Sequence, residues 1–219
     1  MTDADPHADQ PVTLAGPPFA VSGRAIVLIH GRNASPRNIL DLAPRLDRPG
    51  FSLVAPAAAG HTWYPYSFLE HTAKNEPYLT SALNRVSRVI ADVNAAGIPT
   101  SRIVLLGFSQ GACLAAEYGY RHAEPFGGLV LFSGGLIGPP GTTWQTPRSF
   151  RRTPVFLGCS DVDAHVPKWR VDETAATFAA MDAEVTERIY PGMGHLVSDD
   201  EIVAAQSILD RVTRRQTIV

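Results

Sequence analysis

Cysteines, lysines and long apolar runs are scarce in this chain. Only two of its 219 residues are cysteines, Cys113 and Cys159, which are too few for the disulfide framework of a small secreted protein. Both lie in apolar segments, which favours buried free thiols in a reducing compartment. No stretch reaches the roughly 20 apolar residues that a membrane-spanning helix needs. The segment from Met1 to Gln10 is polar and lacks the apolar core of a signal peptide, so we expect a cytoplasmic protein.

An excess of charge of either sign is missing too. The 19 basic and 21 acidic residues give a net charge of −2, and the basic residues are dispersed, so we expect no nucleic-acid partner. Histidine, cysteine and carboxylate residues do not cluster at metal-ligand spacing, and we expect neither metal nor cofactor. With 45% hydrophobic residues, the chain can bury the core of one domain. We expect residues 1–20 to form a flexible N-terminal segment with an edge strand, and residues 21–219 to form that domain.

Apolar runs that predict strands alternate with amphipathic runs that predict helices. The expected strands are 25–29, 51–55, 102–106, 128–132, 154–158 and 184–190, and the expected helices are 36–46, 78–96, 112–116 and beyond, 168–181 and 199–214. Residues 12–15 and 19–22, around Gly16-Pro17-Pro18, predict a short edge hairpin. The alternation favours the α/β class, with a doubly wound, mostly parallel sheet and helices on both faces. Ligands of such sheets bind beyond the carboxyl ends of the strands.

The segment Gly107-Phe108-Ser109-Gln110-Gly111 stands between an expected strand and an expected helix. A Gly-x-Ser-x-Gly run in that context is the nucleophile-elbow pattern, in which a sharp turn exposes the serine hydroxyl. Glycines two residues before and after the serine remove side chains that would collide as strand and helix close together. We therefore predict that Ser109 is a nucleophile. The alternative is a glycine-rich turn in which Ser109 caps the helix.

A serine nucleophile needs a histidine base, and three histidines follow Ser109. His122 falls near the end of the elbow helix and is expected to be exposed there. His195 ends the glycine-rich segment 190–195, which can project an imidazole over the sheet edge, so we predict His195 as the base. His165 competes for this role, but it lies close to the expected acid on the same loop, where mutual orientation is awkward.

The acid that orients the base has two candidates in the loop after residue 158, Asp161 and Asp163. One residue separates them, so in an extended loop they face the same way and periodicity cannot choose. A carboxylate nearer the strand end more often forms a turn. We therefore favour Asp163 as the acid and Asp161 as a brace of the loop.

The reaction also needs backbone N–H groups for the oxyanion of the transition state. The elbow supplies the N–H of Gln110. The loop after the strand at 25–29 supplies the second, and because Gly31 lets the backbone approach, we predict the N–H of Arg32. We expect the Arg32 side chain to face solvent and His30 to brace the loop.

Residues 56–77 form a long aromatic-rich connection, which in a compact domain is more often functional than idle. We predict that Trp63 and Tyr64 from this loop, with Leu136 and Val166, line the substrate pocket. Simple packing of the aromatic side chains onto the core is the alternative for each of them. Whether the loop moves as a lid stays open.

Five segments in order carry a family resemblance: His30-Gly31-Arg32, Gly107-Phe108-Ser109-Gln110-Gly111, Ser133-Gly134-Gly135-Leu136, Asp163-Ala164-His165-Val166-Pro167 and Gly194-His195. From about residue 24 to 213 the chain resembles the phospholipase/carboxylesterase family of α/β-hydrolases. This family includes acyl-protein thioesterases, lysophospholipases and small bacterial carboxylesterases, and the arginine after His30-Gly31 is closer to the bacterial esterases. The resemblance implies an α/β-hydrolase fold and a Ser109–Asp163–His195 triad, and it allows a homodimer.

The expected function is that of a cofactor-free serine hydrolase. It would cleave carboxylic esters of small acyl or aryl substrates through an acyl-enzyme. Cleavage of acyl thioesters or lysophospholipids is the alternative within the same enzyme class. The alternative outside it is a non-catalytic protein with the hydrolase fold that binds a small ligand or a partner.

Overall fold

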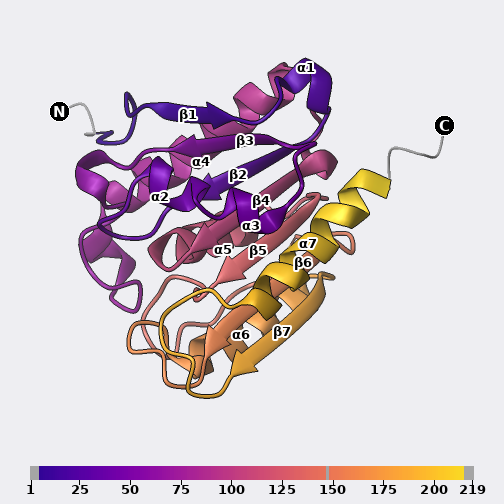
Figure 1. Cartoon of the computed structure of the whole chain (residues 1–219). Helices are drawn as coiled ribbons and strands as arrows, with labels where there is room; N and C mark the ends of the chain where they lie inside the picture. Colours follow the sequence, from indigo (N-terminus) through magenta and orange to yellow (C-terminus); the bar gives the residue numbers. More distant parts are fainter. Residues whose placement is uncertain (1–4, 147, 215–219) are drawn as a thin grey trace.

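The computed structural model describes residues 5–146 and 148–214, which form a seven-stranded sheet between two layers of helices (Figure 1). The strands are β1 (Val12–Ala15), β2 (Ala25–Ile29), β3 (Ser52–Pro56), β4 (Ile103–Phe108), β5 (Gly128–Phe132), β6 (Pro154–Ser160) and β7 (Glu184–Tyr190). The longer helices are α4 (Tyr78–Ala95), α5 (Gln110–Arg121), α6 (Lys168–Ala180) and α7 (Asp199–Arg214), with shorter ones at α1 (Phe19–Ser22), α2 (Pro36–Leu40), α3 (Ala43–Leu46), η1 (Ala59–His61), η2 (Thr72–Asn75) and η3 (Thr100–Arg102).

The strand order is β1-β3-β2-β4-β5-β6-β7. Only β1 runs antiparallel to its neighbour among these strands, and β2 to β7 are parallel. Helices α2, α3 and α7 cover one face, and α4, α5 and α6 cover the other (Figure 1). The expected α/β class with a mostly parallel sheet and helices on both faces is confirmed.

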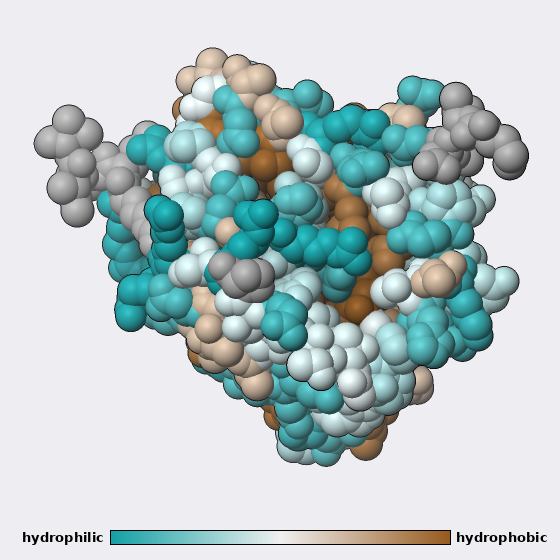
Figure 2. All heavy atoms as spheres, turned by 180° about the vertical axis from the view of Figure 1, so that it is seen from behind, coloured by the Kyte–Doolittle hydropathy of each residue, from teal (hydrophilic) through white to brown (hydrophobic). Residues whose placement is uncertain are grey.

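Burial on both faces explains why the central strands are apolar without interruption. In β2, Val27 and Ile29 join the core beneath α4 and α5, whereas Ile26 and Leu28 join the core beneath α2, α3 and α7. All five β2 residues are buried. On the α4–α6 side, mostly hydrophilic and intermediate residues cover the surface, and strongly apolar residues are visible in a hollow between them (Figure 2). No helix in the described ranges is both long and apolar enough to cross a membrane.

Most elements lie where the sequence predicts them, and β5, β7 and α7 have the expected bounds. The helix expected over 36–46 is instead two short helices, α2 and α3. Leu42 begins α3 as its N-cap, and Pro44 stands in the first turn of this helix. A proline has no backbone N–H to continue a preceding helix, so the chain breaks there.

The expected hairpin of residues 12–15 and 19–22 is wrong in its second half. The edge strand β1 is present, but residues 19–22 form the single turn α1 between Pro18 and the left-handed Gly23. Gly16 has φ 73° at a close approach to the Phe51 carbonyl, where a side chain would collide. This turn carries the chain away from β3 before a second strand can pair.

Within the segment 1–20, which is expected to be flexible, the part from residue 5 onward contacts the rest of the domain; residues 1–4 lie outside the described ranges. His7 is fully buried, its backbone N–H donates to Ser81 Oγ at 2.9 Å, and its ring accepts the N–H of Ala59 at Nδ1. Nδ1 therefore carries no proton, and Nε2–H donates to the Trp63 carbonyl at 2.9 Å. A buried histidine with both ring nitrogens bonded therefore connects this segment to the domain.

Candidate active site

Ser109 occupies a strained turn between β4 and α5, with φ 57° and ψ −123°. A Cβ atom on Gly107 would stand 2.5 Å from the carbonyl carbon of Gly111, and one on Gly111 would stand 2.6 Å from the His30 carbonyl oxygen. Both neighbours are backbone atoms that cannot move aside. The two glycines thus let β4, α5 and the end of β2 meet as the elbow pattern requires. Ser109 does stand at the N-cap of α5, but in the described structure its hydroxyl contacts a histidine instead of capping the helix.

Three side chains from separate loops meet at this turn. Ser109 Oγ lies 2.9 Å from Nε2 of His195, and Nδ1 of His195 lies 2.7 Å from Oδ2 of Asp163. Because a carboxylate only accepts hydrogen bonds, Nδ1–H of His195 donates to Asp163, which leaves Nε2 free to accept the hydroxyl proton of Ser109. The geometry thus joins a hydroxyl, an imidazole and a carboxylate in a single hydrogen-bonded chain.

The Asp163 side chain is fully buried, yet its pKa lies below its usual value. Burial alone would raise the pKa, but hydrogen bonds from His195 and from the backbone N–H groups of His165 and Val166 outweigh it. These two N–H groups donate to Oδ1 at 2.8 and 3.0 Å. Asp163 is therefore held as a carboxylate, able to stabilise a positively charged imidazole.

Aromatic rings fix the orientation of His195. The Phe108 ring lies 4.9 Å from it and the His165 ring contacts it edge-on at 4.7 Å. His165 thus supports His195 in this arrangement, and it is His195 that bonds to Ser109. Sequence reasoning missed the contact role of Phe108, although it stands inside the elbow motif. His122 is exposed at the end of α5, as expected.

Asp161 braces the loop that carries His195. Its Oδ1 accepts the N–H of Gly192 at 2.8 Å, and Ser160 Oγ accepts the N–H of Gly194 at 3.1 Å. Both glycines have positive φ, 66° and 79°. The loop can therefore turn back over the sheet edge and present the imidazole to Ser109.

The loop after β2 presses against the elbow. A Cβ atom on Gly31 would stand 3.3 Å from the Phe108 carbonyl oxygen and 3.4 Å from Ser109 Cβ, so only a small residue fits easily. Arg32 and Gln110 line the same cavity as Ser109. Gln110 is the first residue of α5, and the N–H groups of a first helical turn have no partner within the helix.

The Arg32 side chain is exposed, as expected, and it also makes two hydrogen bonds that the sequence did not predict. Although the residue is exposed, its Nη1 donates to the Pro65 carbonyl at 2.8 Å and its Nη2 donates to the Tyr66 carbonyl at 2.7 Å. The guanidinium group therefore fastens the aromatic loop to the loop after β2.

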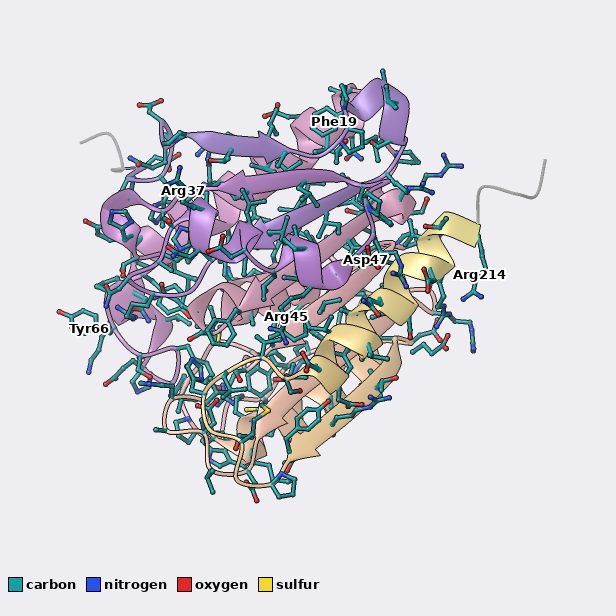
Figure 3. The ribbon with its side chains drawn as sticks, viewed as in Figure 1. Phe19, Arg37, Arg45, Asp47, Tyr66 and Arg214 are labelled. Atoms are coloured by element: carbon teal, nitrogen blue, oxygen red, sulfur yellow. The ribbon has the colours of Figure 1, made fainter. Side chains whose placement is uncertain are left out.

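A cavity of about 530 Å³ opens beside Ser109. It is bounded by the loop after β2, by residues 64–68 of the aromatic loop, and by His165, Val166 and His195. Of the predicted pocket residues, Tyr64 and Val166 line it. Sequence reasoning missed Phe68 and Tyr66, and Tyr66 reaches the outer edge of the molecule (Figure 3).

Trp63 is fully buried and lies outside the described lining of this cavity, so its predicted pocket role is wrong. Its Nε1–H donates to the His30 carbonyl at 2.8 Å, and its ring packs 4.9 Å from the His30 ring. His30 in turn accepts the N–H of Ala58 at 3.1 Å, so it braces the loop as expected. The side-chain oxygen of Gln110 accepts the backbone N–H of Trp63, and its side-chain nitrogen donates to the Tyr64 carbonyl. Trp63 therefore supports the pocket wall from behind.

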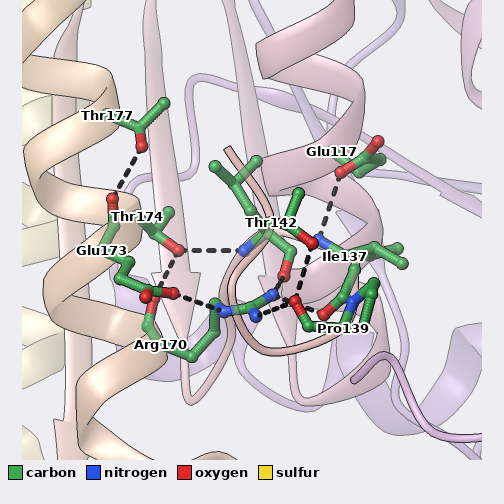
Figure 4. Close-up of polar contacts among 10 residues, drawn as sticks. Glu117, Ile137, Pro139, Thr142, Arg170, Glu173, Thr174 and Thr177 are labelled. Atoms are coloured by element: carbon green, nitrogen blue, oxygen red, sulfur yellow. Dashed lines mark hydrogen bonds and ion pairs between the residues drawn. The ribbon is translucent and has the colours of Figure 1, made fainter. Parts of the chain in front are cut away.

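Leu136 is likewise fully buried and lies outside the cavity lining that the structure describes. Its loop continues through Ile137 and Pro139, and hydrogen bonds from α6 hold this loop in place (Figure 4). The buried guanidinium of Arg170 donates to the carbonyls of Leu136, Gly138 and Pro139. Thr174 Oγ1 accepts the N–H of Leu136 at 2.9 Å. The predicted pocket role of Leu136 is therefore wrong, because these bonds hold its backbone in the interior.

The cysteines are free and buried, as expected, and burial raises the pKa of both thiols to about 12. Cys113 lines the cavity, and Cys159 Sγ lies 3.7 Å from Oδ2 of Asp163. Both stay neutral at physiological pH and are poor nucleophiles. Within residues 5–146 and 148–214, no three histidine, cysteine or acidic side chains are grouped to hold a metal ion.

Comparisons of the sequence with known proteins identify a matching family model and several relatives. The sequence model of the phospholipase/carboxylesterase family matches residues 22–213. A probable carboxylesterase SOBER1-like from Arabidopsis thaliana is 28% identical over 152 residues, 68% of this chain and 58% of the relative. Acyl-protein thioesterase 1 from Saccharomyces cerevisiae is 29% identical over 135 residues, 60% of this chain and 59% of the relative. The chain thus spans about three fifths of the length of these curated relatives.

Solved structures show the same fold. A phospholipase/carboxylesterase from Dyadobacter fermentans is 38% identical, covers 92% of this chain and 97% of its own, and superposes with a TM-score of 0.88. A Bacillus cereus carboxylesterase shares the fold at 18% identity, with a TM-score of 0.74 over 94% of this chain and 95% of its own.

Proposed function

Because the chain belongs to the phospholipase/carboxylesterase family of α/β-hydrolases, we propose that it is a serine hydrolase that cleaves carboxylic esters of small acyl or aryl substrates. The observation that carries the proposal is the continuous hydrogen-bonded chain from Asp163 through His195 to Ser109. A cavity of ligand size adjoins the serine, as a bound ester requires.

In this mechanism Ser109 Oγ attacks the ester carbonyl while Nε2 of His195 takes its proton. Asp163 holds the imidazole and stabilises its positive charge. The N–H groups of Gln110 and Arg32 receive the oxyanion, and each such donor contributes a factor of about 10²–10³ to the rate. His195 then protonates the leaving alcohol, and a water molecule activated by the same imidazole releases the acid.

The cavity beside Ser109 is the expected binding site for the substrate, and we expect it to favour compact substrates. Tyr64, Phe68 and Val166 are among the residues that line it, and Arg32 bonds to the loop that carries the aromatic residues. The similarity to an acyl-protein thioesterase supports a second candidate, acyl-thioester cleavage, which the same three side chains can perform. A series of esters and thioesters of increasing acyl length separates the two, since the ester proposal expects kcat/KM to peak at short acyl groups.

The test of the nucleophile is Ser109→Ala, assayed by release of p-nitrophenolate from p-nitrophenyl acetate. We expect kcat to fall by a factor of about 10⁴–10⁶ while the thermal melt stays nearly unchanged. Ser133→Ala is the matched control, because Ser133 also follows a strand end with positive φ and is buried, but lies outside the described lining of the cavity. Turnover retained by Ser109→Ala would overturn the assignment.

A further inference from the structure

A second cavity adjoins the first one at His195. It has a volume of about 420 Å³ and shares Gly31, Ala34, Phe108 and His195 with the first cavity. Its remaining walls come from His30 after β2, from α2 and α3, and from the loop before α7, through Asn38, Ile39, Leu42, Arg45, Leu196 and Val197. We propose that this cavity binds the alcohol portion of the ester and, after acylation, an acceptor alcohol. The inference rests on the proposed function.

The chemical character of the second cavity is apolar. Ile39, Leu42, Leu196 and Val197 supply aliphatic surface, and Ile39 belongs to the core beneath α2 and α7. Leu196, directly after the proposed base, keeps 47% of its surface exposed. Covering the exposed part of this leucine together with the neighbouring aliphatic surface would be favourable, because apolar area would be removed from water. An alkyl or aryl group on the alcohol would supply that cover.

Arg45 connects α3 with the outer wall of this cavity. The Arg45 guanidinium donates to the Val197 carbonyl at 3.2 and 3.3 Å and pairs with Asp199 at 2.8 Å. Figure 3 shows Arg45 on α3, pointing toward the start of α7. These contacts link the segment that carries Leu196 to α3.

Proton transfer decides which half of the ester enters the second cavity. The carbonyl must sit beside Ser109 and Gln110, which line the first cavity and not the second among the described residues. The leaving oxygen must sit at Nε2 of His195, since this nitrogen protonates it. His195 borders both cavities. The acyl group therefore fills the first cavity, and the group on the leaving oxygen continues past the imidazole into the second.

By microscopic reversibility, the cavity that holds the leaving alcohol can also hold an alcohol that attacks the acyl-enzyme. An alcohol that enters the second cavity attacks the acyl–Ser109 carbonyl with its oxygen, and His195 takes its proton. The bond between the carbonyl carbon and Ser109 Oγ breaks, and His195 returns the proton to Oγ. The products are the new ester and free Ser109, so the step needs no further reactant. Water competes with the alcohol for the same acyl-enzyme.

The test measures this competition. The unaltered protein is acylated with p-nitrophenyl acetate in water containing methanol or 1-butanol, and gas chromatography gives the ratio of acetate ester to acetate. The two alcohols differ little in intrinsic reactivity, and each fully buried methylene is equivalent to about a fourfold gain. Because the cavity is partly open, we expect 1-butanol to be captured about tenfold better per mole than methanol.

Leu196→Asn removes the apolar wall at nearly constant side-chain size. We expect it to lower butanol capture severalfold while the ratio of methanol capture to hydrolysis stays constant. A purely structural disturbance of His195 would instead reduce all three reactions together. Leu14→Asn is the matched control, because Leu14 is 62% exposed on β1, away from both cavities, and all ratios should stay as in the unaltered chain.

The outcomes separate the two proposals. Equal capture of butanol and methanol by the unaltered protein would overturn the alcohol site while leaving ester hydrolysis intact. A Leu196→Asn variant that changes acyl-length preference but not alcohol capture would assign this cavity to the acyl group instead, which also overturns the inference. No release of p-nitrophenolate at all would overturn the proposed function, and the alcohol site with it.

Discussion

Replacing His7 by leucine should destabilise the protein, although this residue lies in a polar segment far from the serine. The change keeps much of the side-chain volume but leaves the Ala59 N–H and the Trp63 carbonyl without their ring partners. An unsatisfied buried polar group costs about 1–3 kcal/mol. We therefore expect the free energy of unfolding to fall by about 2–4 kcal/mol, a large share of the ~5–15 kcal/mol typical of a domain.

The pH dependence of the same variant gives an independent check. Burial, the largest cause, lowers the pKa of His7 in the folded protein despite the bond to Trp63. The unfolded chain then binds more protons near and below the usual histidine pKa of about 6.5, so the contribution of His7 is complete above that pH and is lost as the pH falls. The stability difference between His7→Leu and the unaltered chain should therefore narrow from about pH 7.5 to about pH 5.5, by at most ~1.4 kcal/mol per pH unit.

Urea unfolding followed by tryptophan fluorescence at both pH values measures these differences. His71→Leu is the control, because His71 is exposed, and its effect should stay within about 0.5 kcal/mol. The reasoning would be refuted if His7→Leu lowered the free energy of unfolding by as little as His71→Leu does. It would also be refuted if the difference in this free energy between His7→Leu and the unaltered chain did not change with pH.

Three further expectations concern the site. Asp163→Asn should lower kcat for p-nitrophenyl acetate about 10⁴-fold, because an amide no longer fixes the imidazole tautomer, whereas Asp161→Asn should cost less than about tenfold; the reverse order would overturn the choice of acid. Gly111→Ala should reduce the urea-derived stability by about 3 kcal/mol, since its methyl would collide with the Ile29 and His30 carbonyls, and a near-neutral result would contradict the packing at the elbow. Arg32→Met should raise KM severalfold with a smaller change in kcat, because it frees the aromatic loop but keeps the backbone N–H; steady-state kinetics with unchanged KM would count against that anchor.

The sheet and its principal helices were predictable because their signals are local and repeated. An uninterrupted apolar run such as 25–29 indicates a strand buried on both faces, and α7 shows helical periodicity over its full length. The approach of Ser109, Asp163 and His195 was predictable for another reason, since each follows a parallel strand whose carboxyl end lies at one sheet edge. Their catalytic roles stay predictions.

The misses have a common cause, which is dependence on distant partners. The anchoring of His7 needs Trp63, 56 residues further along the chain, and a lone histidine in a polar segment carries no periodic signal. Trp63 was expected in the pocket because its loop is aromatic, but its indole N–H found the His30 carbonyl inside the core. The guanidinium of Arg32 is exposed as expected, but its bonds to two carbonyls 33 and 34 residues away have no local signal in the sequence.

The antiparallel strand β1 has a practical consequence for anyone who shortens this chain. Val12–Ala15 occupy the outer side of β3 from Leu53 to Pro56. A version starting at β2 would lose this cover together with the His7 anchor, and β3 would present bare N–H and C=O groups to other molecules. Exposed edges of that kind recruit strands from neighbouring copies. Such a truncated protein should precipitate on concentration even if every residue around Ser109 were retained.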